Sequence, residues 1–334
     1  MMLVAVTFSA CRNKNDRLED KDPEIINSAS FKNLTDSIQM FPQDASLYLR
    51  RALRLTQQNA HEPARADFQK AWTLQPSLEN AMPFAANLEI LGKHAERLSL
   101  LESLSQRYPD NEQVSRLLAD AYNTQGRPEK ALLIYKVMIA KDSLNPETLY
   151  EQALILEQLR DTSQAITALK KAYAVQGVDT YGLELAHLYA EQRNPRCLEI
   201  CNFILRRDSV GILIDPFFIK GIYYANIKQY KKAIAEFDSC ISRDWKTTDA
   251  YLEKGRAYFQ MGNFNAALQT FKMAITVTNT DPDAYFWLAR SYEALQRKSD
   301  AASNYLKAIS LDRNFTEARQ RLEKLDPGFA HHGH

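Results

Sequence analysis

Apolar and small residues recur every three or four positions along much of the chain, which is the spacing of one face of an α-helix. Over residues 249–260 they fall at Tyr251, Gly255 and Tyr258, and a short break follows around Gly262. The spacing then resumes at Phe264, Ala267, Phe271 and Ala274. This pattern predicts two helices joined by a very short turn, and such a turn makes them antiparallel neighbours.

The same pattern returns at a fixed distance along the chain. Tyr251 corresponds to Tyr285 (285 − 251 = 34), and Phe271 corresponds to Tyr305 (305 − 271 = 34). A fixed period in this range predicts one helical hairpin stacked many times, because a single hairpin cannot bury its own apolar face. Counting in steps of 34 gives about eight repeats, which start near Asp44, Leu78, Glu112, Pro146, Thr180, Ile214, Thr248 and Pro282.

This hairpin pattern resembles the tetratricopeptide repeat (TPR) family. The first helix carries an aromatic residue, a small residue and Tyr, and the second carries Ala, an aromatic residue and Ala. The resemblance implies an all-α fold: a right-handed superhelical solenoid of about eight repeats over residues 44–315. Residues 25–43 are expected to form an N-terminal capping helix. Residues 316–334 are expected to form a C-terminal capping helix and a tail.

Charge and composition narrow the function classes. The 42 Lys and Arg residues nearly balance the 41 Asp and Glu residues, for a net charge of +1. That balance argues against a nucleic-acid partner and against a polybasic membrane surface. No apolar run approaches the roughly 18–20 residues that a bilayer span needs, so any membrane attachment is expected to be through a lipid.

The N-terminus suggests how such a lipid would be attached. Residues 1–11 resemble the end of a bacterial lipoprotein signal peptide, because an apolar run leads to Ser9, Ala10 and then Cys11. The resemblance implies that the cysteine becomes the new N-terminus and carries the acyl chains. Residues 12–24 are polar and are expected to form a flexible tether.

This resemblance also implies a bacterial cell-envelope location. Arg12 is not the acidic residue that favours retention in the inner membrane, so the outer membrane, on its periplasmic side, is expected. The alternative is a cytoplasmic protein in which residues 1–11 are an ordinary N-terminus.

Candidate binding residues come from the TPR resemblance. In that family the first helix of each repeat lines a concave groove, and fixed positions of that helix face it. The residues at those positions that we select as a candidate partner-binding groove are Phe218, Leu252, Arg256, Phe259, Gln260, Phe286 and Arg290. Arg beside aromatic residues in a concavity is the composition of a binding hot spot. The alternative is that the Arg side chains are solvated and the aromatic ones fill gaps between repeats.

The groove composition also bears on the type of partner. The Lys and Asn clamp of chaperone-type TPR grooves is missing, which disfavours a co-chaperone role. Charge reversal of both Arg256 and Arg290 is expected to abolish partner capture and to leave the melting temperature unchanged.

Residues that often carry chemistry are few. The three cysteines expected to fill small packing positions are Cys197, Cys201 and Cys240, and whether any two of them form a disulfide stays open. His61, His94 and His187 are scattered and have no identifiable Ser, Cys or acidic partner at catalytic spacing. His331, His332 and His334 form a tail that could bind a metal ion without biological role. There is no CxxC pair, HExxH, phosphate loop or nucleophile elbow, so neither a metal site nor a cofactor is expected.

These observations predict a non-catalytic adaptor or scaffold. Nearly every segment is accounted for by a repeat, which leaves no room for a catalytic domain. The adaptor would be held at the membrane by its N-terminal lipid and would bind a peptide or a partner helix in the groove for an envelope process. Two alternatives remain: a cytosolic TPR scaffold or enzyme regulator without a lipid, and a repeat-fused enzyme. The second alternative requires a pocket with a clustered acid and base between repeats.

Overall fold

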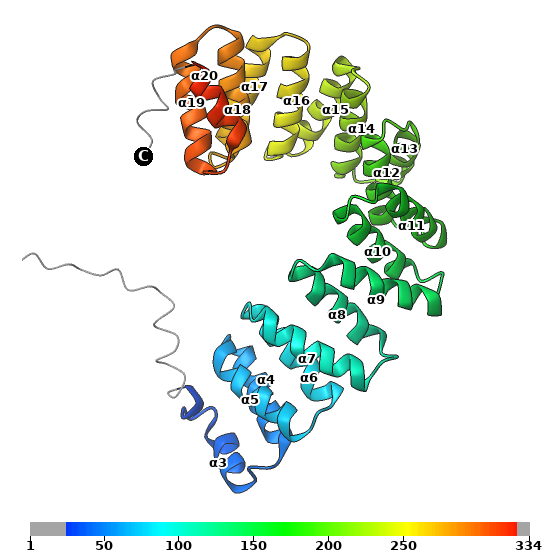
Figure 1. Cartoon of the computed structure of the whole chain (residues 1–334), viewed down its shortest axis with the longest axis vertical. Coiled ribbons are helices and arrows are strands. Elements are labelled where there is room, and N and C mark those ends of the chain that lie inside the picture. The colour runs from blue at the N-terminus through cyan, green and yellow to red at the C-terminus, as the bar shows by residue number, and fades with distance from the viewer. Residues whose placement is uncertain (1–24, 326–334) are drawn as a thin grey trace, which may run out of the picture. The chain divides into compact units, whose positions relative to one another are not determined.

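The structure is a computed structural model that describes residues 25–325. Over that range it contains 18 α-helices, α3 to α20, and no strand (Figure 1). The expected all-α fold is therefore confirmed. No helix between residues 25 and 325 has the length and apolar character of a membrane span. The signal segment, the tether and the histidine tail lie outside the described residues, so the predictions for them stay predictions.

The chain divides after Ser143 into two compact units. The first contains α3 (Lys32–Met40) and then three helical hairpins, in which each helix packs against the next. The hairpins are α4 (Ala45–Gln57) with α5 (His61–Leu74), α6 (Leu78–Ile90) with α7 (His94–Arg107), and α8 (Glu112–Thr124) with α9 (Pro128–Lys141). Phe68, Leu88 and Leu101 are among the fully buried residues of its core.

The second unit contains five hairpins and a final helix, α20 (Thr316–Leu325), which packs against α19. The hairpins are α10 (Pro146–Gln158) with α11 (Thr162–Val175), α12 (Asp179–Glu191) with α13 (Arg196–Arg207), α14 (Asp215–Asn226) with α15 (Tyr230–Arg243), α16 (Thr248–Gln260) with α17 (Phe264–Val277), and α18 (Pro282–Ala294) with α19 (Lys298–Leu311). The first helices α12, α14, α16 and α18 also contact one another in that order, so they share one face of this unit.

The described chain therefore holds eight hairpins, and each first helix begins within one residue of a predicted repeat start. All eight hairpin turns use the same backbone device, a residue in the left-handed region with φ between 57° and 74°. These residues are Asn59, Gly92, Gly126, Arg160, Arg193, Lys228, Gly262 and Gln296. At Gly262 the next amide, of Asn263, donates to the carbonyl of Tyr258 at 3.0 Å, which satisfies the helix end as a Schellman motif does.

Small residues let the two helices of a hairpin approach closely. A Cβ atom on Gly255 would lie 2.5 Å from the ring of Phe271, and one on Gly221 would lie 2.4 Å from the ring of Phe237. Ala289 and Tyr305 take the same places in the last hairpin, and both are fully buried. The aromatic ring of the second helix thus fills the space that the small residue of the first helix leaves open.

The cysteines of the described chain are packing residues. Cys197, Cys201 and Cys240 are free thiols with no exposed surface. Burial raises the pKa of Cys197 to about 11. It raises the pKa of Cys201 and of Cys240 to about 12. They stay protonated at neutral pH, which makes them poor metal ligands and poor nucleophiles.

Candidate binding surface

The seven groove residues selected from the sequence all lie on first helices of the second unit. Phe218 is on α14, and Phe286 and Arg290 are on α18. The other four, Leu252, Arg256, Phe259 and Gln260, are on α16. Because α14, α16 and α18 contact one another in order, these residues belong to one face.

Four of the seven gather around one residue that the sequence did not single out, Trp287 of α18. The guanidinium carbons of Arg256 and Arg290 lie 5.1 and 5.4 Å from the centre of its ring. The ring of Phe259 meets it edge-on at 5.6 Å, and the ring of Phe286 does so at 5.7 Å. An Arg over an aromatic face contributes about 0.5–2 kcal/mol, more when desolvated. We call Arg256, Phe259, Phe286, Trp287 and Arg290 the arginine–tryptophan cluster.

Acidic residues hold Arg256 in this cluster. Its Nη1 donates to Oε1 of Glu253 at 2.6 Å, and its Nη2 lies 4.0 Å from Oδ1 of Asp283. Its Nε is buried and meets no hydrogen-bond acceptor within the described residues. Burial raises the pKa of Glu253 and of Asp283, and the charge of Arg256 opposes both shifts. The two carboxylates are therefore only partly compensated by the arginine.

The last helix α20 supplies the counter-charges for α18. Nη1 of Arg290 lies 3.5 Å from Oε1 of Glu317, and Nη1 of Arg321 lies 3.3 Å from Oε1 of Glu293. The hydroxyl of Tyr305 donates to the other oxygen of Glu293 at 2.6 Å. These contacts join α18, α19 and α20 at the end of the second unit.

Three of the selected residues do not form the exposed surface of the cluster. Leu252 and Phe286 are 7% and 2% exposed, so they support the surface from beneath rather than form it. Phe218 packs on Phe237 within its own hairpin, with ring centres 5.8 Å apart. Of the seven, Gln260 alone is exposed, and the role of all seven in binding stays a prediction.

An open pocket of about 310 Å³ lies beside the cluster. Its lining residues are Arg193, Ala225, Asn226, Lys228, Tyr230, Glu253, Arg256, Ala257 and Gln260. Three of them are cations and one is an acid, so the pocket has a positive net charge. Arg193 and Lys228 are the left-handed residues of two successive hairpin turns. The sequence analysis missed these two residues because it considered only positions on first helices. They take equivalent turn positions in successive repeats, 35 residues apart (228 − 193 = 35), and this spacing could have identified them.

Two of the scattered histidines have acidic neighbours in the structure. His94 and His187 both have acidic partners: Nδ1 of His94 lies 3.6 Å from Glu89, and Nε2 of His187 lies 4.0 Å from Glu191. Glu191 and His187 are one helical turn apart, so this pair could have been recognised from the sequence. The partner of His94 lies across a hairpin turn, which spacing along one helix does not show.

Models of known repeat families match four stretches of the chain. A model described as "TPR repeat" matches residues 255–296. Two models described as "Tetratricopeptide repeat" match residues 146–177 and 282–315, and residues 91–146. The matched stretches lie in both compact units.

Curated relatives match over part of their length only. Tetratricopeptide repeat protein 14 of Mus musculus is 26% identical over 112 residues, which are 31% of this chain and 15% of that protein. Superkiller complex protein 3 of Mus musculus is 23% identical over 164 residues, which are 48% of this chain and 10% of that protein. The chain therefore spans about a tenth to a seventh of the length of these relatives.

Solved structures share the fold. A tetratricopeptide repeat protein from Parabacteroides merdae aligns with a TM-score of 0.52 and 18% identity, over 84% of this chain and 98% of that one. A chain of the Cut9–Hcn1 hetero-tetramer of the APC/C aligns with a TM-score of 0.54 and 15% identity, over 94% of this chain and 60% of that one.

Proposed function

Because the chain is a tetratricopeptide repeat protein, we propose that it is a non-catalytic adaptor that holds a peptide or a partner helix against the face formed by α14, α16 and α18. Proteins built from these repeats are protein-interaction scaffolds, and stacked repeats provide extended surfaces suited to that role. The cluster and the pocket on this face set the chemistry of the partner.

The observation that carries the proposal is the positive pocket beside the arginine–tryptophan cluster. The pocket has room for one or two side chains, and Arg193 and Lys228 at its rim are exposed. Glu253, its one acid, is already paired with Arg256. An acidic side chain of the partner would therefore meet uncompensated positive charge, and the neighbouring aromatic residues would exclude water from the contact.

A peptide library displayed on phage and selected on the full-length chain tests this function. We expect the enriched peptides to share an acidic residue. Lys228→Glu should weaken the binding of a selected peptide by about tenfold, equivalent to about 1.4 kcal/mol. The matched control is Lys170→Glu, an exposed lysine on the second helix α11, which should leave the affinity unchanged. If the Lys228→Glu variant and the parent chain bind the selected peptide with equal affinity, the pocket is not the binding site.

Charge reversal at Arg256 is a poorer test than the sequence suggested. Arg256→Glu would place a third carboxylate beside Glu253 and Asp283, whose pKa values burial already raises. We therefore expect that variant to lower the melting temperature, whereas the sequence alone predicted no change for the double charge reversal.

For the location of the adaptor, we propose attachment to a bacterial envelope membrane through acyl chains on Cys11. The support is the sequence alone: an apolar run followed by Ser9, Ala10 and Cys11. Two or three acyl chains hold a protein stably, at about 0.8 kcal/mol per buried methylene. Cys11→Ser should move the protein from the membrane fraction to the soluble fraction of its host. A variant that remains with the membrane would contradict the lipid anchor.

The competing proposal is a cytosolic scaffold without a lipid. The near-neutral net charge of +1 fits either location. Intact-mass spectrometry of the protein from its own host distinguishes the two. An unmodified chain that starts at Met1 favours the cytosolic scaffold, whereas an acylated chain that starts at Cys11 favours the envelope adaptor.

A further inference from the structure

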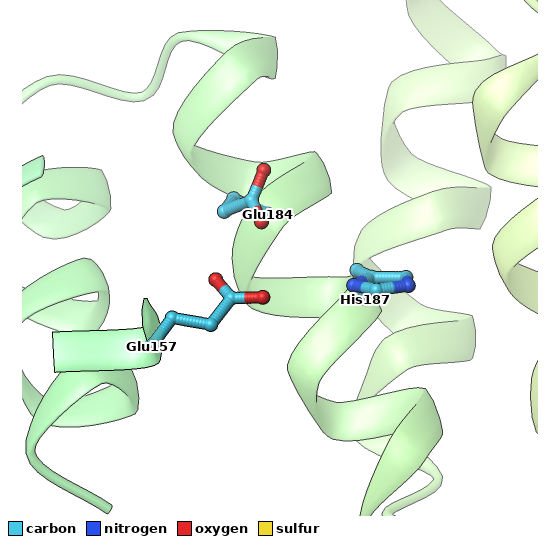
Figure 2. Close-up of side chains that lie close together, drawn as sticks. All are labelled: Glu157, Glu184 and His187. Atoms are coloured by element: carbon cyan, nitrogen blue, oxygen red, sulfur yellow. The ribbon is translucent and has the colours of Figure 1, made fainter. Parts of the chain in front are cut away.

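Two successive first helices of the second unit bring a histidine and two carboxylates together. Glu157 lies near the end of α10, and Glu184 and His187 lie in the middle of α12. Their ligand atoms all lie within 4.8 Å of one another. Figure 2 shows Glu157 reaching from its own helix toward the helix that carries Glu184 and His187. All three side chains are half-buried.

The fold fixes this arrangement at the level of the backbone. Glu184 and His187 are three residues apart, so they project from the same face of α12. The neighbouring Leu185, Ala186 and Leu188 are buried in the core, which sets the rotation of that helix. The rings of Tyr150 on α10 and Tyr181 on α12 lie 4.9 Å apart, so the two helices pack against each other at that point.

The three residues form a mixed nitrogen and oxygen donor set. The Glu-x-x-His spacing on one helix, with a further Glu from a facing helix, is an arrangement by which helical proteins bind transition metals. Imidazole favours zinc, iron, nickel and copper, whereas magnesium and calcium prefer oxygen ligands alone. We propose that Glu157, Glu184 and His187 bind one divalent transition-metal ion between α10 and α12. This proposal does not depend on the adaptor function.

The charges around these three residues also favour a bound cation. Burial and the nearby charge of Glu184 raise the pKa of Glu157, and His187 opposes the shift. Glu191 adds a further negative charge close by. The two carboxylates thus repel each other without an ion, and a divalent cation would relieve that repulsion.

The side chains need only small movements to bind an ion. Metal bonds to carboxylate oxygen and to imidazole nitrogen are about 2.0–2.2 Å long, so ligand atoms around one ion lie closer together than the present limit of 4.8 Å. Half-buried Glu side chains can close this gap by rotation about their own bonds. Three protein ligands leave at least one position of the ion open, as in metal sites that bind water or a further ligand.

Among the described residues the three cysteines compete little for the metal, and the tail histidines can be removed. Cys197, Cys201 and Cys240 are buried and protonated, as their raised pKa values require. The tail residues His331, His332 and His334 are replaced by Gln in the full-length chain used for the test, which serves as the parent.

Zinc is the probe, titrated into this parent by calorimetry. We expect one Zn²⁺ per chain, with a rise in the thermal unfolding midpoint when the ion is bound. Glu157→Gln and His187→Gln should each weaken binding by at least about tenfold, since even second-shell changes at metal sites cost about 10–100-fold. Neither variant should unfold the metal-free protein, because each removes a charged or half-buried group without leaving a cavity.

Two matched variants separate ligation from general attraction by negative charge. Glu191→Gln removes the same charge one helical turn away and should weaken binding by less than about threefold. His94→Gln removes a histidine that has an acidic neighbour but no second carboxylate of this kind, and should change nothing. The proposal is overturned if the parent binds no zinc, if Glu191→Gln weakens binding as much as Glu157→Gln does, or if His187→Gln binds like the parent.

Discussion

At the scale of single residues, the pair of Arg256 with Glu253 shows that a short ion pair does not by itself stabilise a fold. Its guanidinium contacts Glu253 at 2.6 Å and lies over Trp287. Nevertheless the pKa of Glu253 is raised, because burial disfavours the carboxylate more than the charge and hydrogen bond of Arg256 stabilise it. The pair therefore fixes the position of Arg256 in the cluster more than it stabilises the fold.

This balance predicts the effect of Glu253→Gln. The folded pKa of Glu253 lies above its ordinary value of 4.5, so the ionised side chain destabilises the fold at neutral pH. That cost disappears as the pH falls through the folded pKa toward 4.5. We expect Glu253→Gln to unfold at a higher temperature than the unmodified chain at pH 7.5, and the difference to shrink as the pH is lowered. Circular dichroism melts over this pH range measure it.

Glu62 provides the opposite case as a control. Burial raises its pKa, but Arg65 and Lys93 lower it further, so its folded pKa lies below the ordinary value. Glu62 therefore contributes stability above pH 4.5 that is lost as the pH falls through its folded pKa. Glu62→Gln should lower the midpoint at pH 7.5. A lower midpoint for both variants at that pH would mean that the Arg256 pair stabilises the fold after all.

At the scale of the element, the helical hairpin was predictable almost completely from the sequence. Its apolar spacing, its short break and its fixed period depend on neighbouring residues, and these set where each helix begins and ends. Even the hairpin starting near Thr180, which carries Pro195, keeps its helices, because Pro195 lies just before α13 begins at Arg196. Proline is tolerated at that end of a helix.

The close contact inside the hairpin gives the prediction at this scale. Gly255→Ala places a Cβ atom 2.5 Å from the ring of Phe271, which is buried and cannot move away freely. We expect a loss of about 1–3 kcal/mol in the free energy of unfolding, measured with urea. Gly177→Ala is the matched control: nothing lies within 4 Å of its added Cβ, so its stability should stay the same or rise slightly. Similar losses at both positions would point to glycine flexibility instead of packing.

At the scale of the whole molecule, the sequence predicted that the seven selected residues share one face of first helices in the second unit, but it missed other residues of that face. Arg290 does lie over Phe259, and Arg256 joins them through Trp287, because the repeat period carries equivalent positions to one face. Trp287 was missed because it is neither a groove position nor a repeat landmark. The grouping of Glu157 with Glu184 and His187 also escaped notice, because it joins different positions of two successive repeats. Such contacts depend on how one hairpin is rotated against the next.

Site-specific photo-crosslinking tests whether partners bind to the face of first helices in the second unit. A photoreactive amino acid is placed at Gln260 on α16 or, as the matched control, at Gln269 on α17. Both side chains are exposed glutamines of the same hairpin, and only Gln260 lines the pocket. We expect irradiation in the native host to give one discrete crosslinked partner from Gln260, lost with Lys228→Glu, and none from Gln269. A partner crosslinked from Gln269 but not from Gln260 would contradict this expectation.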